Sequence, residues 1–323
     1  MFQVNVALPS GKSEIFEIPG SSKVGDLKIL AQESFGQRFL RLVSAEGNSL
    51  LDLQASLQTA GIRDRDRLTA IACQAKVAAS RHAFAMCCTG GDRIVTWGAA
   101  DLGGDSSEIQ DQLRVGQIQD VQTTGSAFAA ILRDGYVITW GAENFGGDSS
   151  LVQDRLKSVQ EIQAANRAFA AILANGSVVT WGDPWCGGDM SAVQDQLKNV
   201  KQIQATNFAF AAISQDGSVV TWGRTDLGGD ISDVQHQLKG VEQIQATNSA
   251  FAAILTDGSA VTWGRQSHGG DSSAVQDRLK SVQQLQATDC SFAAILADGS
   301  VVTWGFQGFG GDSSAVQDHF TYL

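Results

Sequence analysis

One dipeptide, Trp-Gly, recurs along most of this chain at an almost constant interval. Its successive tryptophans are separated by 43, 41, 41, 41 and 41 residues. They are Trp97, Trp140, Trp181, Trp222, Trp263 and Trp304. A fixed period of this length is typical of repeat architectures, in which each small unit buries its faces only against its neighbours. The sequence therefore predicts six stacked copies of one unit, numbered here 1 to 6 in chain order.

Each copy holds three short segments with the features of β-strands. In copy 4 these are Gln202–Thr206, Phe210–Ile213 and Ser218–Gly223, which are alternating, small-residue and β-branched segments in turn. Asp216-Gly217 separates the second strand from the third and predicts a tight type I′ hairpin. The other copies carry Asp134-Gly135, Asn175-Gly176, Asp257-Gly258 and Asp298-Gly299 at this position.

The rest of each copy begins with Gly-Gly-Asp and predicts a short helix of about two turns. Asp or Ser can cap such a helix, and apolar residues stand four apart within it. These apolar pairs are Val193/Leu197, Val234/Leu238 and Val275/Leu279. The aspartate after Gly-Gly occurs in all six copies, which indicates a cap or turn ligand rather than a catalytic acid. It is Asp105, Asp148, Asp189, Asp230, Asp271 and Asp312.

The first 72 residues contain no copy of the repeat. Their patterns predict strand, strand, helix, strand and a last strand, with serine at the start of the helix. The predicted segments are Gln3–Leu8, Ser13–Ile18, a helix through Val24 and Leu30, Phe39–Val43 and Arg67–Ile71.

This segment resembles ubiquitin and its relatives in SGKSEIFEI, VGDLKILAQ, LRLVSAEGNSL and SLQTAGIRDRDRLTAI. The resemblance implies a β-grasp domain over residues 1–73. It also implies an apolar protein-binding patch on Leu8, Val43 and Ile71, flanked by Arg41 and Thr69. The alternative interpretation is that these are ordinary strand residues. The family's diglycine tail is missing, because the chain continues from Ile71 into the repeats, so covalent conjugation through this end is not expected.

The repeats resemble the regulator of chromosome condensation family in AAILTDGSAVTWG and AAILADGSVVTWG. The resemblance covers residues 76–323 and implies a six-bladed β-propeller with three strands and a short helix per blade. Family repeats are longer and usually number seven, so an open β-repeat superhelix is the alternative. The founding member catalyses nucleotide exchange on a small GTPase through a protruding insertion. No copy here has an insertion longer than two residues, which leaves exchange activity as the alternative function.

Composition excludes several classes of function. Residues 1–75 carry eight basic and eight acidic residues, whereas the remainder carries 15 basic and 26 acidic ones. An acidic repeat region repels phosphate backbones, so nucleic acid is not expected as a partner. There is no apolar run of 18 residues, so no membrane span is expected. The five cysteines and four histidines show no ligand spacing, and no nucleophile or phosphate-loop motif is present. No metal, cofactor or enzymatic activity is therefore expected.

Two groups of residues differ between the copies, namely the four after each Trp-Gly and the pair before each Phe-Ala strand. Both are predicted loops, where binding residues are usually found on a rigid scaffold. The alternative is neutral drift of exposed loops. The variable residues of the types enriched in interfaces are Trp185, Phe208, Arg265, Phe306 and Phe309.

These observations predict a non-catalytic interaction scaffold or adaptor. Its ubiquitin-like head would link it to ubiquitin-binding proteins, and its repeat rim would hold a protein client. A monomer in the cytoplasm, the nucleus or both is expected. The alternatives are a guanine-nucleotide exchange factor-like regulator of a small GTPase, and a structural or lectin-like rim binder in which the head is only a folding cap.

Overall fold

The computed structural model describes residues 1–50, 52–88, 91, 93–113 and 117–317. The chain divides into two compact units, one of Met1–Ala78, Ala85–Thr96 and Ser106–Asp120, the other of Ala79–Phe84, Trp97–Asp105 and Val121–Leu323. The domain boundary expected between residues 73 and 76 stays a prediction. The predicted end of the repeats, residues 318–323, lies outside the described residues. Within the described part of the chain, no helix is both long and apolar enough to cross a membrane.

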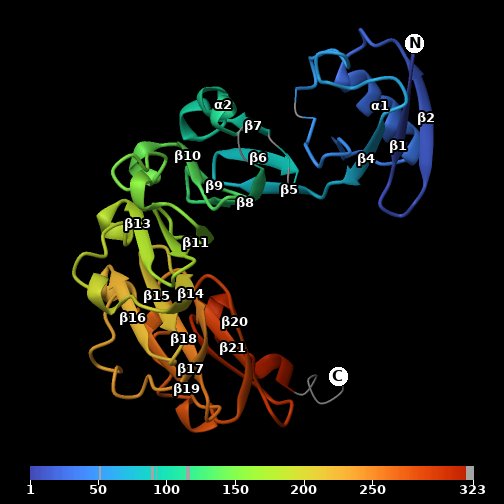
Figure 1. Cartoon of the computed structure of the whole chain (residues 1–323). Helices are drawn as coiled ribbons and strands as arrows, with labels where there is room; N and C mark the ends of the chain where they lie inside the picture. Colours follow the sequence, from blue (N-terminus) through green and yellow to red (C-terminus); the bar gives the residue numbers. More distant parts are fainter. Residues whose placement is uncertain (51, 89–90, 92, 114–116, 318–323) are drawn as a thin grey trace. The chain divides into compact units, whose positions relative to one another are not determined.

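The head is a mixed four-stranded sheet with one helix, as the sequence predicts (Figure 1). Strand β1 pairs with β2 in an antiparallel hairpin and with β4 in parallel, and β3 pairs with β4 antiparallel. The order across the sheet is β2-β1-β4-β3. The elements are β1 (Phe2–Ala7), β2 (Ser13–Ile18), α1 (Val24–Phe35), β3 (Leu40–Val43) and β4 (Arg67–Ala72). That this head is ubiquitin-like stays a prediction.

Alternating apolar residues of the head's strands meet the apolar face of α1. Val4, Val6, Leu27, Leu42 and Leu68 are all at most 2 % exposed. The predicted serine cap of α1 is wrong. The helix begins at Val24, with Lys23 as its N-cap residue. The Asp26 carboxylate, inside the first turn, accepts the Lys23 backbone N–H at 2.9 Å, so this N–H is satisfied by a helix residue and not by a serine before the helix.

Each copy forms its own three-stranded sheet with the second strand in the middle, which confirms the predicted blade-like sheets. The first strands are β5 (Ala75–Ala79), β8 (Ile118–Thr123), β11 (Val159–Ala164), β14 (Val200–Ala205), β17 (Val241–Ala246) and β20 (Val282–Ala287). The second strands are β6 (Ala83–Cys88), β9 (Ala127–Leu132), β12 (Ala168–Leu173), β15 (Ala209–Ser214), β18 (Ala250–Leu255) and β21 (Ser291–Leu296). The third strands are β7 (Ile94–Gly98), β10 (Val137–Gly141), β13 (Val178–Gly182), β16 (Val219–Gly223), β19 (Ala260–Gly264) and β22 (Val301–Gly305).

The hairpins differ from the predicted type I′ turn, which needs a positive φ at both central residues. Only the glycine has one, with φ of +79° at Gly135 and similar values in copies 3 to 6. The aspartate keeps an ordinary backbone conformation because its carboxylate accepts the N–H two residues on, as Asp134 does from Tyr136 at 3.0 Å. The result is a three-residue loop closed by the Leu132 N–H on the Tyr136 carbonyl at 2.8 Å.

The predicted two-turn helix is also wrong, since this segment contains only one short turn in most copies. In copy 2 the leucine of the apolar pair, Leu156, is fully buried, and Ser158 then takes a left-handed φ of +56°. The chain therefore leaves the turn and enters the next strand. The elements are η2 (Ser107–Ile109) with α2 (Gln110–Leu113), η4 (Gln153–Arg155), η6 (Gln194–Gln196), η9 (Gln276–Arg278) and η11 (Ser314–Val316).

A second 3₁₀ turn, which the sequence did not predict, follows each Trp-Gly. Its glycine C-cap has a positive φ in every copy, for example +89° at Gly187. The turns are η1 (Ala100–Leu102), η3 (Glu143–Phe145), η5 (Pro184–Cys186), η7 (Thr225–Leu227), η8 (Gln266–His268) and η10 (Gln307–Phe309).

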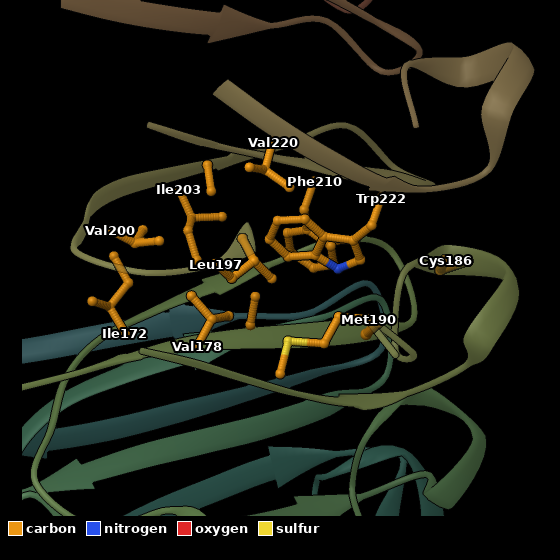
Figure 2. Close-up of a cluster of buried hydrophobic side chains, with 14 residues drawn as sticks. Ile172, Val178, Cys186, Met190, Leu197, Val200, Ile203, Phe210, Val220 and Trp222 are labelled. Atoms are coloured by element: carbon orange, nitrogen blue, oxygen red, sulfur yellow. The ribbon is translucent and has the colours of Figure 1, made fainter. Parts of the chain in front are cut away.

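Neighbouring copies pack through a buried Phe–Trp pair. In copy 4 the rings of Phe210 and Trp222 stack with centroids 5.3 Å apart. Figure 2 shows this pair among Val178, Leu197 and Met190, which belong to copy 3. Because each sheet places alternate side chains on opposite faces, copy 4 in turn contributes its other face to the core shared with copy 5.

Two contacts, found at every junction between copies, join the loop after Trp-Gly of one copy to the Phe–Trp pair of the next. In copies 2 to 6 the Nε1–H of the repeat tryptophan donates to the carbonyl of the C-cap glycine in the preceding copy, and the phenylalanine ring lies against that glycine. The tryptophan bonds are Trp140 to Gly103 at 3.2 Å, Trp181 to Gly146 at 3.0 Å, Trp222 to Gly187 at 3.0 Å, Trp263 to Gly228 at 3.1 Å and Trp304 to Gly269 at 3.0 Å.

The two end copies each leave one of these contacts unmade. Phe84 and Trp97 of copy 1 are 43 % and 45 % exposed, whereas their equivalents in the other copies are almost completely buried. At the other end, Gly310 has open space where the other C-cap glycines meet an aromatic ring. The individual three-stranded sheets are of the predicted propeller type, and whether they form a closed propeller or an open superhelix stays a prediction.

Candidate functional site

The structure brings together the two groups of residues that vary between copies. In copy 4 the backbone N–H of Arg224, the first residue after Trp-Gly, donates to the carbonyl of Phe208 at 2.9 Å. The same bond occurs in every copy, so the two groups form one composite loop surface per copy. The remaining pairs are Ala99–His82, Ala142–Ser126, Asp183–Arg167, Arg265–Ser249 and Phe306–Cys290.

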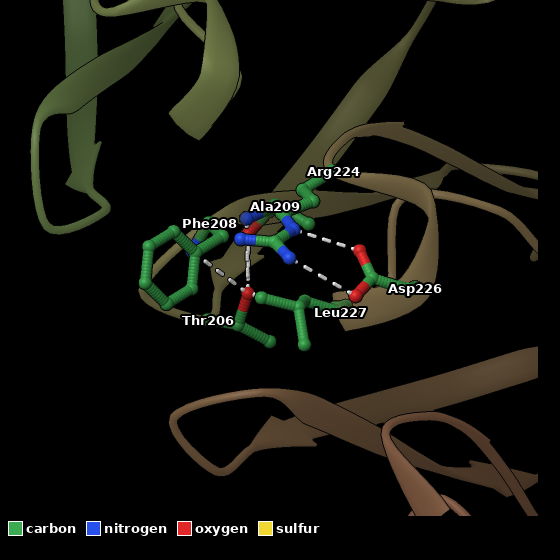
Figure 3. A network of polar contacts seen from close by, with 6 residues as sticks. All are labelled: Thr206, Phe208, Ala209, Arg224, Asp226 and Leu227. Atoms are coloured by element: carbon green, nitrogen blue, oxygen red, sulfur yellow. Dashed lines mark hydrogen bonds and ion pairs between the residues drawn. The ribbon is translucent and has the colours of Figure 1, made fainter.

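The copy 4 site is held by a buried threonine (Figure 3). The Thr206 hydroxyl donates to the Leu227 carbonyl at 3.2 Å and accepts the Ala209 N–H at 2.9 Å, which ties the two loops to each other. Above them Arg224 forms a two-point contact with Asp226, with Nε–Oδ1 and Nη2–Oδ2 distances of 2.8 and 3.3 Å. The Arg224 guanidinium also lies 5.8 Å from the Phe208 ring centroid.

The composite loops of successive copies are joined by a backbone ladder. The residue before each variable pair donates its N–H to the carbonyl of the same residue in the next copy. These bonds run from Arg81 to Gly125, Gly125 to Asn166, Asn166 to Asn207, Asn207 to Asn248 and Asn248 to Asp289, at 2.8–3.1 Å. The loops therefore follow one another along one edge of the repeats, which we call the variable-loop strip. Its members used below are Trp185, Phe208, Arg224, Asp226, Arg265 and Phe306.

The middle of the strip contains a groove. A hollow of about 700 Å³ between the loops of copies 3 and 4 is lined by Pro184, Trp185, Arg224, Thr225 and Asp226. Trp185 is 76 % exposed, which is unusual for a large aromatic side chain. The groove thus combines an uncovered indole ring with a paired guanidinium and carboxylate.

Charge changes along the strip. In copy 3 Arg167 pairs with Asp183 at 3.0 Å and lies 4.6 Å from the Phe145 ring centroid, so its charge is partly neutralised. Arg265 of copy 5 is exposed and has no ion pair with any residue that the structure describes. Burial, and then the charge of Arg265, lower the pKa of His268 in the same loop. Arg265 is therefore a cation of the strip that is open to an external anion.

The other predicted residues of the repeats lie near the end of the strip. Phe306 and Phe309 are 50 % and 49 % exposed, and their rings form a tilted pair with centroids 5.7 Å apart. Phe208 is half-buried, because part of its ring packs on the core between copies 3 and 4. Arg167, Arg224 and Asp226 were missed by the sequence reasoning. The sequence feature that could have indicated them is the presence of arginine together with aspartate in the variable loops of one copy.

The residues of the predicted binding patch of the head are only partly exposed, and that they bind a partner stays a prediction. Val43 is only 8 % exposed, because the chain folds back over this end of β3 through a bridge between Val43 and Ser49. Leu8 is half-buried and packs on the head's core. Arg41, Thr69 and Ile71 are also half-buried on the paired strands β3 and β4.

The repeated aspartates act as turn ligands, one of the two predicted roles. The Asp189 carboxylate accepts the Ser191 N–H at 2.8 Å, and the equivalent bond forms at Asp148, Asp230, Asp271 and Asp312. These bonds lower the pKa of Asp189, because they stabilise the ionised carboxylate. Across the described residues there is no group of three or more His, Cys, Asp or Glu placed to hold a metal ion, and all five cysteines are free thiols.

No protein-family model matches this chain. No curated protein matches it either. Solved structures with a similar chain course include yeast Prp20p, at 13 % identity over 84 % of this chain and 81 % of that one, with a TM-score of 0.47. Human WBSCR16 follows at 13 % identity over 75 % and 81 % of the two chains, TM-score 0.46. The ectodomain of the Arabidopsis thaliana receptor kinase ACR4 has 15 % identity over 71 % and 80 %, TM-score 0.42.

Prp20p is yeast RCC1, a regulator of chromosome condensation. The repeat sequence was compared above with this family. At such identities and TM-scores the likeness carries no argument about what this chain does. The fold described above rests on this chain's own contacts.

Proposed function

We propose that this chain is a non-catalytic protein-binding module that holds an extended segment of a client protein along its variable-loop strip. The observation that carries the proposal is the convergence of the two variable groups into one composite loop per copy, with each loop joined to the next by a backbone hydrogen bond. A rigid repeated scaffold with variable loops is a common way to build a binding surface.

The side chains of the strip suit a protein partner. Trp185, Phe306 and Arg265 are exposed and of the types that dominate binding energy in protein interfaces. The uncovered Arg265 guanidinium favours a carboxylate on the partner, and the groove beside Trp185 favours an apolar or aromatic side chain. We therefore propose a client segment that carries an acidic residue next to an apolar anchor.

Peptide display tests this proposal. A random peptide library is selected on the immobilised full chain, and the enriched peptides are synthesised with a fluorescent label and titrated by anisotropy. We expect Trp185→Ala or Arg265→Ala to weaken binding by about tenfold or more. Leu151→Ala is the matched control, because Leu151 is 99 % exposed and lies outside the variable-loop strip. Failure to enrich any peptide, or equal binding by all variants, would contradict the proposal.

A link to the ubiquitin system through the head is a weaker candidate, because Val43, one of the three apolar residues of the expected patch, is only 8 % exposed. The second candidate is regulation of nucleotide exchange on a small GTPase. Prp20p is described with its binding to Gsp1p and histones, and this is a property of that protein. Release of a fluorescent nucleotide from a panel of small GTPases decides this candidate. A rate that this chain leaves unchanged across the panel dismisses it.

A further inference from the structure

Every internal junction between copies uses the same pair of complementary faces. One face presents a C-cap glycine and its carbonyl, and the other presents a stacked Phe–Trp pair whose indole N–H reaches that carbonyl. The backbone ladder adds a third contact, from an N–H of one copy to a carbonyl of the next. Among the described copies, this leaves one face of each kind unused, the aromatic face of copy 1 and the glycine face of copy 6.

Copy 1 ends with the aromatic face unused. The rings of Phe84 and Trp97 stack at 5.3 Å as in the other copies, so the face is already formed. It is nevertheless uncovered, with exposed fractions of 43 % and 45 % against 0 % and 4 % for Phe210 and Trp222. Within the part of the chain that the structure describes, Trp97 has no acceptor for its indole N–H.

Copy 6 ends with the glycine face unused. Gly310 has the left-handed φ of +95° seen in the other C-cap glycines, but nothing lies within 4 Å of the position of a Cβ. At Gly187 the same position is 2.6 Å from a ring carbon of Phe210. Ile295 on the same face is 40 % exposed, whereas its equivalent in copy 3, Ile172, is 6 % exposed.

The two ends of the backbone ladder carry opposite charges. Its internal members are Gly125, Asn166, Asn207 and Asn248, all uncharged, whereas its end members are Arg81 and Asp289. Both end residues are exposed, and neither forms an ion pair with a described residue. Continuing the ladder would bring the Asp289 N–H to the Arg81 carbonyl and place the two charged side chains at one junction.

We propose that these ends bind each other between molecules, so that the copy 6 end of one chain docks on the copy 1 end of a second chain. Both faces are uncovered in the described part of the chain, and a second copy of this chain offers the glycine, the aromatic pair and the opposite charge that match them together. A contact of this kind joins two different faces and is therefore head-to-tail. It extends to short filaments or closes into a ring of several chains. This replaces the monomer expected from the sequence.

Sedimentation velocity over a concentration series tests the contact directly, in the presence of a reductant that prevents disulfide formation. The wild-type chain should show a weight-average sedimentation coefficient that rises with concentration. Arg81→Asp and Asp289→Arg should each weaken association several-fold, and the double variant Arg81→Asp/Asp289→Arg should restore it. A non-specific apolar aggregate would not recover in the double variant.

A second pair of variants keeps the test independent of charge. Gly310→Asn places a side chain where the partner's Phe84 ring would lie, and asparagine tolerates a positive φ better than other residues do. Gly11→Asn is the matched control, because Gly11 has a φ of +93° and equally open space in the head. Gly310→Asn should abolish association and Gly11→Asn should leave it unchanged.

Mixing two variants, each with one intact end, tests how many chains the contact joins. A Gly310→Asn chain keeps only its copy 1 end, and a Trp97→Ala chain keeps only its copy 6 end, so their mixture should form a species of two chains and no larger one. Trp185→Ala controls for the loss of an exposed tryptophan. A wild-type chain that sediments as one monomer at every concentration, or larger species that survive in Gly310→Asn, would overturn the proposal.

Discussion

The C-cap glycines allow packing and backbone strain to be separated in one experiment. Gly187 and Gly310 occupy the same position in copies 3 and 6, with φ of +89° and +95°. Alanine at either residue has a left-handed backbone, which costs about 1–2 kcal/mol. At Gly187 the new Cβ would also lie 2.6 Å from the Phe210 ring, which is fully buried, whereas at Gly310 it would meet nothing.

The Phe210 ring has little freedom to move away from that Cβ. It is stacked on Trp222, whose Nε1–H donates to the Gly187 carbonyl at 3.0 Å. Overpacking of this kind costs about 1–3 kcal/mol, and weakening the tryptophan hydrogen bond costs about 1 kcal/mol more. We therefore expect Gly187→Ala to lower the free energy of unfolding by about 2–4 kcal/mol more than Gly310→Ala does.

Urea unfolding followed by tryptophan fluorescence measures this difference. It is carried out at a concentration where sedimentation shows a single chain, so that association does not contribute to the stability. The m-values of the variants must agree for the midpoints to be compared. Equal losses at the two glycines would refute the argument that the junction requires glycine for packing, and would leave backbone strain as the whole effect.

Two further predictions follow from the same contacts. Trp222→Ala should destabilise the chain by about 3–5 kcal/mol, because its ring is 4 % exposed, whereas Trp185→Ala should leave the thermal midpoint almost unchanged; similar shifts for both would contradict the assignment of Trp185 to the surface. The Ser191 and Ser273 N–H groups lower the pKa values of Asp189 and Asp271 in the folded chain, so the stability they add is present above the unfolded pKa and is lost as the pH falls through the folded one. Unfolding midpoints measured below about pH 4 should therefore fall with pH, and less steeply in Asp189→Asn/Asp271→Asn; an unchanged slope would contradict this contribution.

The sequence predicted the sheets well because their signals are local and repeated. Alternation in Gln202–Thr206 and the β-branched run before Trp222 each define a strand without reference to the rest of the chain. The helix before β11 was mispredicted for a non-local reason. Burial of Leu156 and the left-handed Ser158 end it early, and neither follows from the spacing of Val152 and Leu156.

The candidate site shows the same difference between local features, which the sequence predicts, and non-local contacts, which it does not. Comparing the copies indicated which loop residues vary, but not that Phe208 and Arg224 share a backbone hydrogen bond. The contact of Trp222 with Gly187 spans 35 residues and depends on how copies stack, which the repeat period alone does not define. Val43 was placed on the head's surface by resemblance, and the local bridge to Ser49 buries it.

The uniform junction has a consequence for how such a chain can change its length. Because the glycine carbonyl of each copy meets the same Phe–Trp pair in the next, removing or inserting one whole 41-residue unit would leave a junction chemically identical to those on either side. Duplication of the gene segment could therefore lengthen the row of loops one position at a time without a new core having to evolve. The number of loops available to a client would be set by recombination, and their individual chemistry by point mutation.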